Sequence, residues 1–258
     1  MEVKDQINRH VEIKGYPQRI VSLVPSITEL LVDLGLEEQM VGRTRFCIHP
    51  ADKVKKIPVI GGVMGLNTHE INKTGADLIL AAKEENAQRE VLDLAKTHPV
   101  WVSDVHNLED ALEMIASIGQ ICGRDDRAGQ IQQQIREAFS QLNHIPPGII
   151  RAVYLIWNNP FYTINRNTFI HDMLQRCGIE NVFADKSESY PIISEKEIRA
   201  SKPDFILLPS EPYNFKASEL NKLADSFPKA EIKRVEGEYF TWYGSHLIHA
   251  PSYFKQLF

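Results

Sequence analysis

Aromatic residues cluster in three segments that each follow a predicted strand in the second half of the sequence. Ligands of open α/β sheets bind beyond the carboxyl ends of the strands, and large flat side chains in such loops suit a large flat ligand. The alternative, for any single ring, is that it packs a core or a contact between lobes. The segments are Trp157–Tyr162 after the strand pattern at 152–156, Glu211–Tyr213 after 204–208, and Glu238–Gly244 after 231–235.

Residue types that would carry catalysis or hold a bare metal ion form no specific pattern. The sequence contains no Gly-x-Gly-x-x-Gly, no Walker loop, no Gly-x-Ser-x-Gly and no His-Glu-x-x-His motif. None of the nine histidines pairs with another at the four-residue spacing of a zinc-binding helix. Ser26 opens a predicted helix, where it is an N-cap, a nucleophile or an anion contact. We therefore expect no catalytic residues, no catalytic cofactor and no metal ligands.

Composition and charge are those of a globular protein without a nucleic-acid partner. The 258 residues are 43% hydrophobic and 24% charged, and the net charge of −5 argues against a nucleic-acid surface. No apolar stretch is long enough for a transmembrane segment, and Met1–Asp5 lacks the apolar core of a signal peptide. The odd number of scattered cysteines, namely Cys47, Cys122 and Cys177, fits a reducing compartment. We therefore expect a cytoplasmic protein; the alternative is an exported protein whose signal was removed and replaced by Met1.

Strand and helix patterns alternate on both sides of one long helix pattern in the middle of the chain. The helix is expected at 125–143, where Ala128, Ile131 and Ile135 recur at helical spacing before Pro146-Pro147-Gly148 stops it. One alternative is a further helix of a single α/β domain. The restart of the strand pattern after the break favours two lobes, because strands alternating with helices predict a covered parallel sheet on each side.

This organisation sets the expected domains and elements. The domains are an N-terminal α/β lobe at 1–123, a backbone helix at 124–145 and a C-terminal α/β lobe at 146–258. Strands are expected at 11–13, 19–24, 40–44, 77–81, 99–102, 152–156, 204–208 and 231–235. Further helices are expected at 25–34, 67–73, 86–97, 108–122, 168–177, 194–201, 217–226 and 245–258, the last kinked or restarted at Pro251.

Several short motifs occur in an order that covers nearly the whole chain. They are Arg19–Leu31, Val41–Thr44, Gly61-Gly62 and Gly65–Asn67, then Pro160–Thr163, Asp172–Gly178, Glu180–Phe183, Lys202–Leu207 and Phe240–Ser245. In this order they resemble the class III (helical-backbone) substrate-binding proteins of ABC transporters, most closely the cobalamin-binding branch. The resemblance implies two Rossmann-like lobes with parallel sheets, joined by a single long helix. It also implies a cobalamin, haem or ferric siderophore in the cleft between the lobes, and a family that is mostly periplasmic or lipid-anchored outside the membrane.

The resemblance also assigns ligand-facing residues by position. An aromatic sandwich suits a corrin, because burying its flat faces contributes about 25 cal/mol per Å². Arginines at the rim would pair with propionates or amides, which favours haem or a carboxylate-bearing chelate. The implied ligand-facing residues are Phe46 and Val63 in the first lobe and Trp157, Tyr162, Tyr190, Phe240 and Trp242 in the second, with Arg43, Arg45 and Arg166 as the arginines.

The sequence departs from the family pattern where a permease would dock. Transporter-coupled members present one surface carboxylate on each lobe, and here these positions fall at His69 and Lys196. Either the register shifts by one, and an ABC permease would dock through the neighbouring Glu70 and through Glu195 or Glu197, or the docking charges are gone, since a lysine repels the permease arginines. In the first lobe, Val63 and Ala82 stand where cobalamin-binding members carry tryptophans. Together with the missing signal peptide, these departures favour a cytoplasmic relative that still binds a metal chelate or is a sensor or carrier of one. We expect the protein to be a monomer.

Two other functions remain open from the residues. A receptor for a bare zinc, manganese or iron ion needs three or four ligands from both lobes, with His49 and Glu85 in the first lobe and Glu211 or Glu238 in the second as candidates. A cytosolic tetrapyrrole chelatase would use a histidine and a glutamate as base and metal guide. The candidate pairs are His69 with Glu70 and His49 with Glu85.

Overall fold

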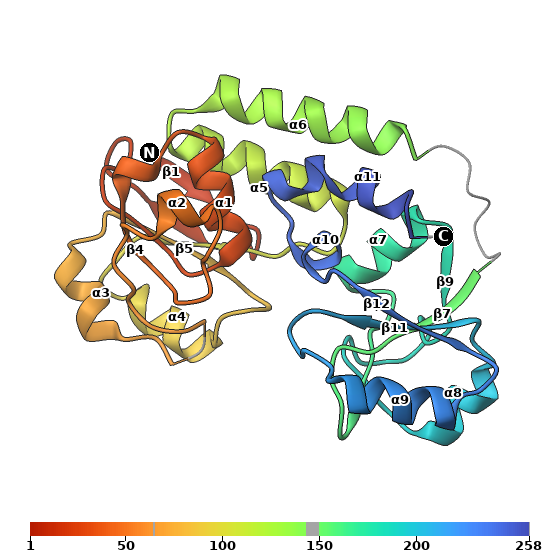
Figure 1. The fold of residues 1–258 in the computed structure, drawn as a ribbon. Helices are drawn as coiled ribbons and strands as arrows, with labels where there is room; N and C mark the ends of the chain where they lie inside the picture. Colours follow the sequence, from red (N-terminus) through yellow and green to blue (C-terminus); the bar gives the residue numbers. More distant parts are fainter. Residues whose placement is uncertain (64, 143–149, 258) are drawn as a thin grey trace. The chain divides into compact units, whose positions relative to one another are not determined.

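The chain forms two compact units in a computed structural model that describes residues 1–63, 65–142 and 150–257 (Figure 1). The first unit comprises Met1–Val105, Glu109–Glu137 and Trp242–Ile248, and the second comprises His106–Leu108, Ala138–Thr241 and His249–Phe258. Each unit contains a four-stranded parallel sheet. The predicted fold class, α/β with two lobes of parallel sheet, is therefore confirmed.

The predicted central helix is confirmed as α6, Asp125–Ser140. It carries the chain from the first unit to the second, because the division falls between Glu137 and Ala138. Residues 143–145 of the predicted helix and its Pro146-Pro147-Gly148 stop lie outside the described residues. The predicted domain boundaries at 1–123, 124–145 and 146–258 stay a prediction.

The sheet of the first unit has the strand order β4-β3-β5-β6, and all its neighbours are parallel. Its strands are β3 (Ile20–Ser22), β4 (Met40–Arg43), β5 (Leu78–Ala82) and β6 (Val100–Ser103). Every residue of β3, β5 and β6 is buried, as expected for strands covered on both faces. The helices of this unit are α1 (Pro25–Asp33), η1 (Glu37–Gln39), α2 (Ala51–Val54), α3 (Thr68–Thr74), α4 (Gln88–Leu94), α5 (Leu108–Ile121) and η2 (Ser245–Ile248).

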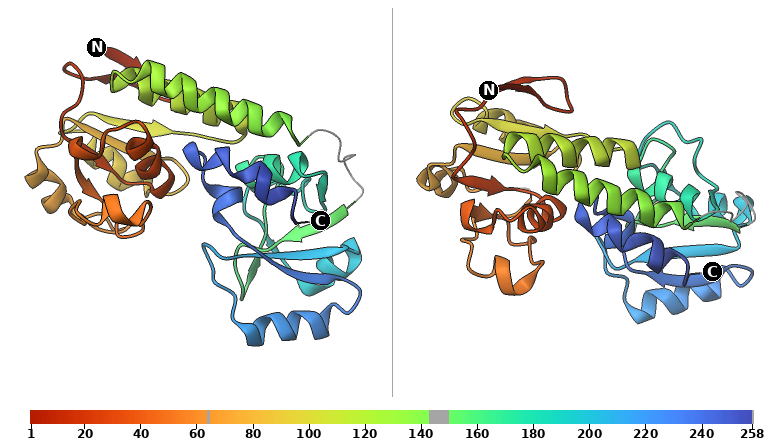
Figure 2. Two further views of the ribbon diagram at one scale, coloured as in Figure 1. Left: turned by 45° about the horizontal axis from the view of Figure 1, so that its top comes forward. Right: turned by 90° about the horizontal axis from the view of Figure 1, so that it is seen from above.

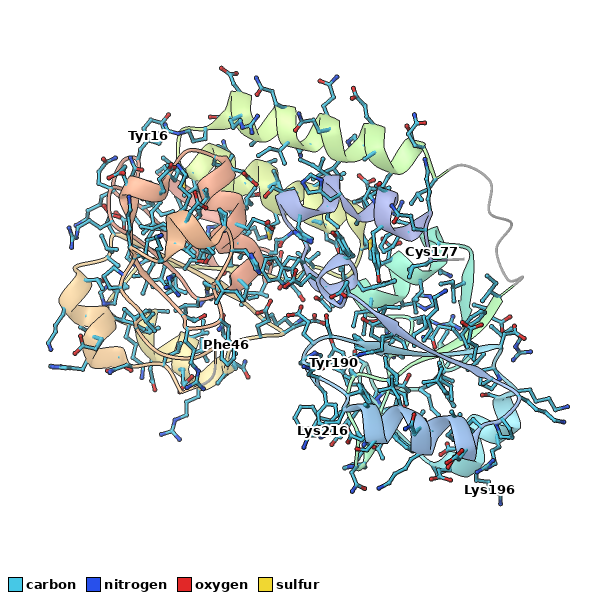
Figure 3. All side chains as sticks on the ribbon, viewed as in Figure 1. Tyr16, Phe46, Cys177, Tyr190, Lys196 and Lys216 are labelled. Carbon is cyan, nitrogen blue, oxygen red and sulfur yellow. The ribbon has the colours of Figure 1, made fainter. Side chains whose placement is uncertain are left out.

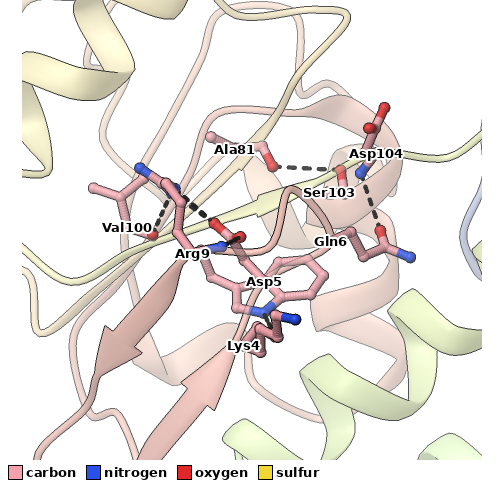
Figure 4. A network of polar contacts seen from close by, with 9 residues as sticks. Lys4, Asp5, Gln6, Arg9, Ala81, Val100, Ser103 and Asp104 are labelled. Atoms are coloured by element: carbon pink, nitrogen blue, oxygen red, sulfur yellow. Dashed lines mark hydrogen bonds and ion pairs between the residues drawn. The ribbon is translucent and has the colours of Figure 1, made fainter.

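An N-terminal hairpin, formed by β1 (Glu2–Lys4) and β2 (His10–Glu12), covers the outer edge of β6 (Figure 4). Asp5 and Arg9 close the hairpin through an ion pair of 2.8 Å. The guanidinium of Arg9 also donates to the carbonyl of Val100 at 2.9 Å, and the Gln6 N–H donates to the carbonyl of Val102 at 3.1 Å. These bonds satisfy an edge that would otherwise be open to pairing. The sequence predicted only the second strand of this hairpin.

The sheet of the second unit has the order β12-β11-β7-β9 and is also parallel. Its strands are β7 (Ile150–Tyr154), β9 (Ile179–Asn181), β11 (Phe205–Pro209) and β12 (Glu231–Val235), and β8 (Phe161–Tyr162) pairs separately with β10 (Ile192–Ile193). The helices are α7 (Phe169–Arg176), α8 (Glu195–Ser201), α9 (Ala217–Ser226), α10 (Glu238–Thr241) and α11 (Ala250–Phe254). Pro251 occupies the first turn of α11, so the predicted restart of the last helix is confirmed.

Both sheets follow the same chain order. In each, the first strand lies centrally, the second pairs on one side, and the third and fourth extend the other side. The order therefore reverses between β3 and β5 and between β7 and β11. In open α/β sheets this reversal, beyond the carboxyl ends of the strands, is where ligands bind. The fold therefore predicts that a ligand would bind at the loops that follow these four strands.

Helices α5 and α6 run side by side in all three views (Figures 1 and 2). Ala128, Ile131 and Ile135 form the buried face of α6, as the helical spacing predicts. Gly119 of α5 allows the close approach, because a Cβ at this position would lie 2.4 Å from the Cβ of Ala128. On the solvent side of α6, Gly129 has no neighbouring atom within 4 Å of the equivalent position.

The two helical glycines give a matched pair of substitutions. Gly119→Ala should lower the free energy of unfolding by about 1–3 kcal/mol, because the added methyl group overpacks the contact between the helices. Gly129→Ala should raise it by roughly 0.5–1 kcal/mol, because alanine is the better helix former and nothing obstructs it. Urea denaturation followed by circular dichroism measures both effects. Changes of the same sign in the two variants would contradict this account of α5 and α6.

Candidate functional site

The second unit exposes an aromatic face at the reversal point of its sheet. Trp157 follows β7 and Tyr213 follows β11, and their ring centroids lie 4.9 Å apart with the planes inclined by 57°. The side chain of Trp157 is 43% exposed. Tyr162 of β8 is half-buried beside it, since its N–H donates to the Trp157 carbonyl at 3.3 Å. We call Trp157, Tyr162 and Tyr213 the aromatic face.

Hydrogen bonds to one carboxylate hold the residues of the aromatic face in place. The carboxylate of Glu219, in the first turn of α9, accepts hydrogen bonds from the Tyr213 hydroxyl and from the side-chain amide of Asn158. The predicted site residues included Trp157 and Tyr162, but not Tyr213, Asn158 or Glu219. The strand-then-loop pattern indicated Tyr213. No periodicity could indicate Glu219, because its partner Asn158 lies 61 residues away and Tyr213 lies in the loop before α9.

Tyr190 and Arg166 lie in neighbouring loops of the same unit. Tyr190 is half-buried in the segment that leads into β10, whose first residue, Ile192, is 55% exposed (Figure 3). Arg166 is exposed, pairs with Asp185 and donates to the Ala184 carbonyl at 3.3 Å. Its guanidinium therefore stays at the surface, where it can also meet a carboxylate.

Phe240 and Trp242 have almost no exposed surface. Phe240 is fully buried, with its ring centroid 5.4 Å from Tyr154 and 4.9 Å from Phe254. Their segment was expected to be a loop, but residues 238–241 form α10, which turns Phe240 into the core of the second unit. Trp242 is 5% exposed and packs in the first unit against the ring of His49. Their predicted ligand contacts stay a prediction, and the exposed rings are the better supported contacts.

The loop after β4 presents the exposed apolar residues of the first unit. Phe46 and Ile48 are 47% and 52% exposed, and Phe46 stands out from the unit (Figure 3). The guanidinium of Arg45 lies 5.0 Å from the centre of the Phe46 ring, a cation–π contact that orders both side chains. Val63 is half-buried, and its carbonyl accepts a 3.0 Å hydrogen bond from the side chain of Asn86, which follows β5.

Arg43 differs from the other two arginines. It is buried, its Nε donates to the Val54 carbonyl at 2.8 Å, and a terminal nitrogen donates to the Thr44 carbonyl at 3.2 Å. These bonds hold the loop after β4 in place. Its predicted pairing with a ligand carboxylate stays a prediction, and Arg45 and Arg166 are the exposed candidates for that role.

Two of the candidate residues for catalysis or a bare metal ion accept hydrogen bonds from other side chains, and a third is buried. Ser26 is not the N-cap of α1, which is Val24; the Ser26 hydroxyl is buried without a hydrogen-bond partner among the described residues. Glu85 accepts from the Tyr243 hydroxyl at 3.3 Å, and Glu211 accepts from the Thr241 hydroxyl at 2.7 Å. Across residues 1–63, 65–142 and 150–257, no group of three or more His, Cys, Asp or Glu side chains is placed to hold a metal ion.

The carboxylates predicted to meet a permease lie on two helices. Glu70 of α3 forms an ion pair of 2.8 Å with Lys73, and Glu195 of α8 lies 3.4 Å from Arg199. Glu197 forms more polar contacts than the other two. It pairs with Lys186 at 2.6 Å and also caps α8 by accepting from the N–H and hydroxyl of Ser194. Glu70 and Glu195 each pair with a single cation in the described ranges of the chain, so they are the candidates with fewer competing contacts.

One family accounts for most of the chain. The family described as periplasmic binding protein matches residues 20–229. The chain belongs to the periplasmic binding protein family. The described part of the chain has no helix of sufficient length and hydrophobicity to span a membrane. The cytoplasmic location expected from the sequence stays a prediction.

Individual relatives of this periplasmic binding protein extend the comparison to sequence and fold. A vitamin B12-binding protein of Pectobacterium carotovorum subsp. carotovorum is 25% identical over 201 residues, which cover 76% of this chain and 72% of that protein. The periplasmic vitamin B12 binding protein BtuF of Vibrio cholerae has a TM-score of 0.79 at 18% identity, over 94% of this chain and 98% of that one. The periplasmic heme-binding protein RhuT from Roseiflexus has a TM-score of 0.75 at 20% identity, over 93% and 96%. The resemblance stated from the sequence is confirmed for the family and the fold.

The capping carboxylate of Glu197 makes stability depend on pH. Hydrogen bonds from Lys186 and from the N–H and hydroxyl of Ser194 lower the pKa of Glu197 from 4.5 to about 2. A lowered folded-state pKa means that the stabilising contribution is complete above the ordinary pKa and is lost as the pH falls toward the folded-state value. Glu197→Gln should therefore lower the urea midpoint at neutral pH, and the gap to the wild type should close between about pH 5 and pH 2. A gap that stays constant over this range would contradict the assignment.

Proposed function

We propose that this chain is a non-catalytic binding protein for a flat metal chelate, namely a corrinoid such as cobalamin, a haem or a ferric siderophore. The observation that carries the proposal is the exposed aromatic face at the reversal point of the second sheet, where Trp157 stays 43% exposed against Tyr213. An exposed tryptophan at the carboxyl end of a parallel sheet suits a ligand that covers it. The names of the relatives support the ligand class, because they are vitamin B12-binding and heme-binding proteins.

The affinity would come mainly from burying the aromatic face. Covering about 100 Å² of ring surface contributes roughly 2.5 kcal/mol at 25 cal/mol per Å², so a few such contacts bring the dissociation constant into the micromolar range. In the first unit, Phe46 and Val63 would add apolar contact from the loops after β4 and before α3. Arg45 would add a charged hydrogen bond at the ligand's edge.

The role of such a protein is to deliver a solute. We propose that the chain is the solute-binding component of an ABC importer or a relative of one, with Glu70 and Glu195 as the carboxylates that would meet arginines of a permease. Both lie on short surface helices and pair with one cation of their own helix. No observation favours the chelatase or the receptor for a bare metal ion.

Titration with cyanocobalamin, haemin and a ferric hydroxamate siderophore, followed by absorbance and tryptophan fluorescence, tests the proposal. At least one chelate should bind with a micromolar or lower dissociation constant. Trp157→Ala should weaken this binding by about 50-fold, which corresponds to the loss of about 100 Å² of ring contact. Tyr16→Ala is the matched control, because Tyr16 is 60% exposed but precedes β3 at the amino end of the sheet. If no chelate binds below the millimolar range, where binding amounts to only about −4 kcal/mol, the proposed ligand class is wrong.

The exposed arginines distinguish the chelates. Haem and carboxylate-bearing siderophores carry negative groups at the rim, whereas the corrin amides are neutral, so an arginine contributes more to the former. Arg45→Gln and Arg166→Gln should weaken haemin binding several-fold while changing cyanocobalamin binding by less than about twofold. Isothermal titration of both ligands against each variant measures this difference. Equal losses for the two ligands would show that these arginines act only through the structure of their loops.

A further inference from the structure

One carboxylate connects the aromatic face to a helix. Oε1 of Glu219 accepts two hydrogen bonds, from the Tyr213 hydroxyl at 2.7 Å and from the side-chain amide of Asn158 at 2.6 Å. Oε2 accepts the backbone N–H of Lys216, immediately before α9, at 2.7 Å. Oε1 of Glu219 therefore holds the residues around Trp157, and Oε2 caps α9.

The bonds to Oε1 restrain Trp157 from two directions. Tyr213 packs against the Trp157 ring at 4.9 Å, and the next residue in the chain, Asn158, is fixed by its own amide. Tyr213 also packs edge-on against Phe215, with centroids 4.9 Å apart, and Phe215 is buried in the core of the unit. The indole is thus exposed but held between a core-anchored ring and a hydrogen-bonded neighbour.

We infer that Glu219 is a positioning residue, which holds Trp157 and Tyr213 in the arrangement that receives the flat face of the ligand. The inference rests on the proposed function for the identity of the ligand and names the residue that prepares its site. Ordering exposed rings before binding lowers the entropy that binding must overcome. The side chain of Glu219 need not touch the ligand for this purpose.

The electrostatics agree with this role. The N–H of Lys216, the Tyr213 hydroxyl and the Asn158 amide lower the pKa of Glu219, so the group is ionised at neutral pH. The hydrogen bond to this carboxylate raises the pKa of Tyr213, which keeps the phenol protonated as the donor. A glutamine at this position has only one accepting oxygen, so it cannot serve both Tyr213 and the Lys216 N–H.

Glu197 provides a matched control in the same unit. It also stands in the first turn of a short helix, accepts the N–H of the residue before that helix, and binds two further side-chain groups, the Ser194 hydroxyl and the Lys186 ammonium. These bonds join Glu197 to Lys186 and Ser194, and within the described part of the chain none of them involves Trp157, Asn158 or Tyr213. Glu197→Gln therefore removes a similar helix cap without touching the aromatic face.

The first measurement needs no ligand. Trp101 and Trp242 are 0% and 5% exposed, so acrylamide quenching of the native protein reports on Trp157. Glu219→Gln and Tyr213→Phe should each increase the quenching constant and lower the fluorescence anisotropy, because the indole loses a restraint. Glu197→Gln should leave both unchanged. Far-UV circular dichroism confirms that all variants are folded.

The second measurement is chelate affinity. Glu219→Gln should weaken binding of the best chelate about tenfold, Tyr213→Phe should do the same, and the double variant should be no weaker than either, since both remove one coupled contact. Glu197→Gln should bind within about twofold of the wild type. Additive losses would overturn the inference, because the two residues would then act independently. An equal loss in Glu197→Gln would also overturn it, because the loss would then reflect a general loss of stability.

The two measurements separate the inference from the proposed function. A wild-type protein that binds no chelate removes the proposed function, while looser Trp157 emission in Glu219→Gln still supports the positioning role. A wild-type protein that binds a chelate, together with unchanged quenching and affinity in both Glu219→Gln and Tyr213→Phe, removes the positioning role and leaves the proposed function standing.

Discussion

The parallel pairing of strands is the constraint on which the rest of this structure depends. Parallel neighbours require a crossover after each strand, so all carboxyl ends of a sheet meet at one edge. In the second unit the order reverses between β7 and β11, and the loops after these two strands place Trp157 beside Tyr213. Helices cover both sheet faces in such folds, which leaves this edge as the place where large side chains can remain at the surface.

Aromatic residues that follow different strands of the second sheet differ in burial, and the surrounding contacts explain the difference. After β12 the chain turns directly into α10, and Phe240 enters the core between Tyr154 and Phe254. After β7 the polar side chain of Asn158 is held by Glu219, so the preceding indole stays at the surface. A ring in a loop therefore indicates a ligand only where its polar neighbours hold it outward.

The sequence predicted the regular elements well, because their signals are local. Apolar spacing located α6, and short continuous apolar runs located β5 and β11. The short elements α2, β8, β9 and β10 lack any periodicity, and tertiary contacts decide them. Among the site residues, loop position indicated Trp157 and the family resemblance indicated Phe46, and both side chains are exposed. The buried state of Arg43 and Phe240 depends on the Val54 carbonyl and on the core rings, which no spacing in the sequence reveals.

A binding surface for a large flat ligand must be both exposed and ordered, and these demands conflict. Exposed rings gain little from packing, so a free indole would move and would lose that freedom on binding. The contacts around Glu219 resolve the conflict with a charge that stays hydrated at the edge of the unit, while its hydrogen bonds reach inward to Tyr213 and Asn158. Because the same carboxylate caps α9, the helix and the aromatic face are ordered together. The aromatic face is therefore ordered as part of the folding of its sheet and helices, and the proposed ligand would need no separate ordering step when it arrives.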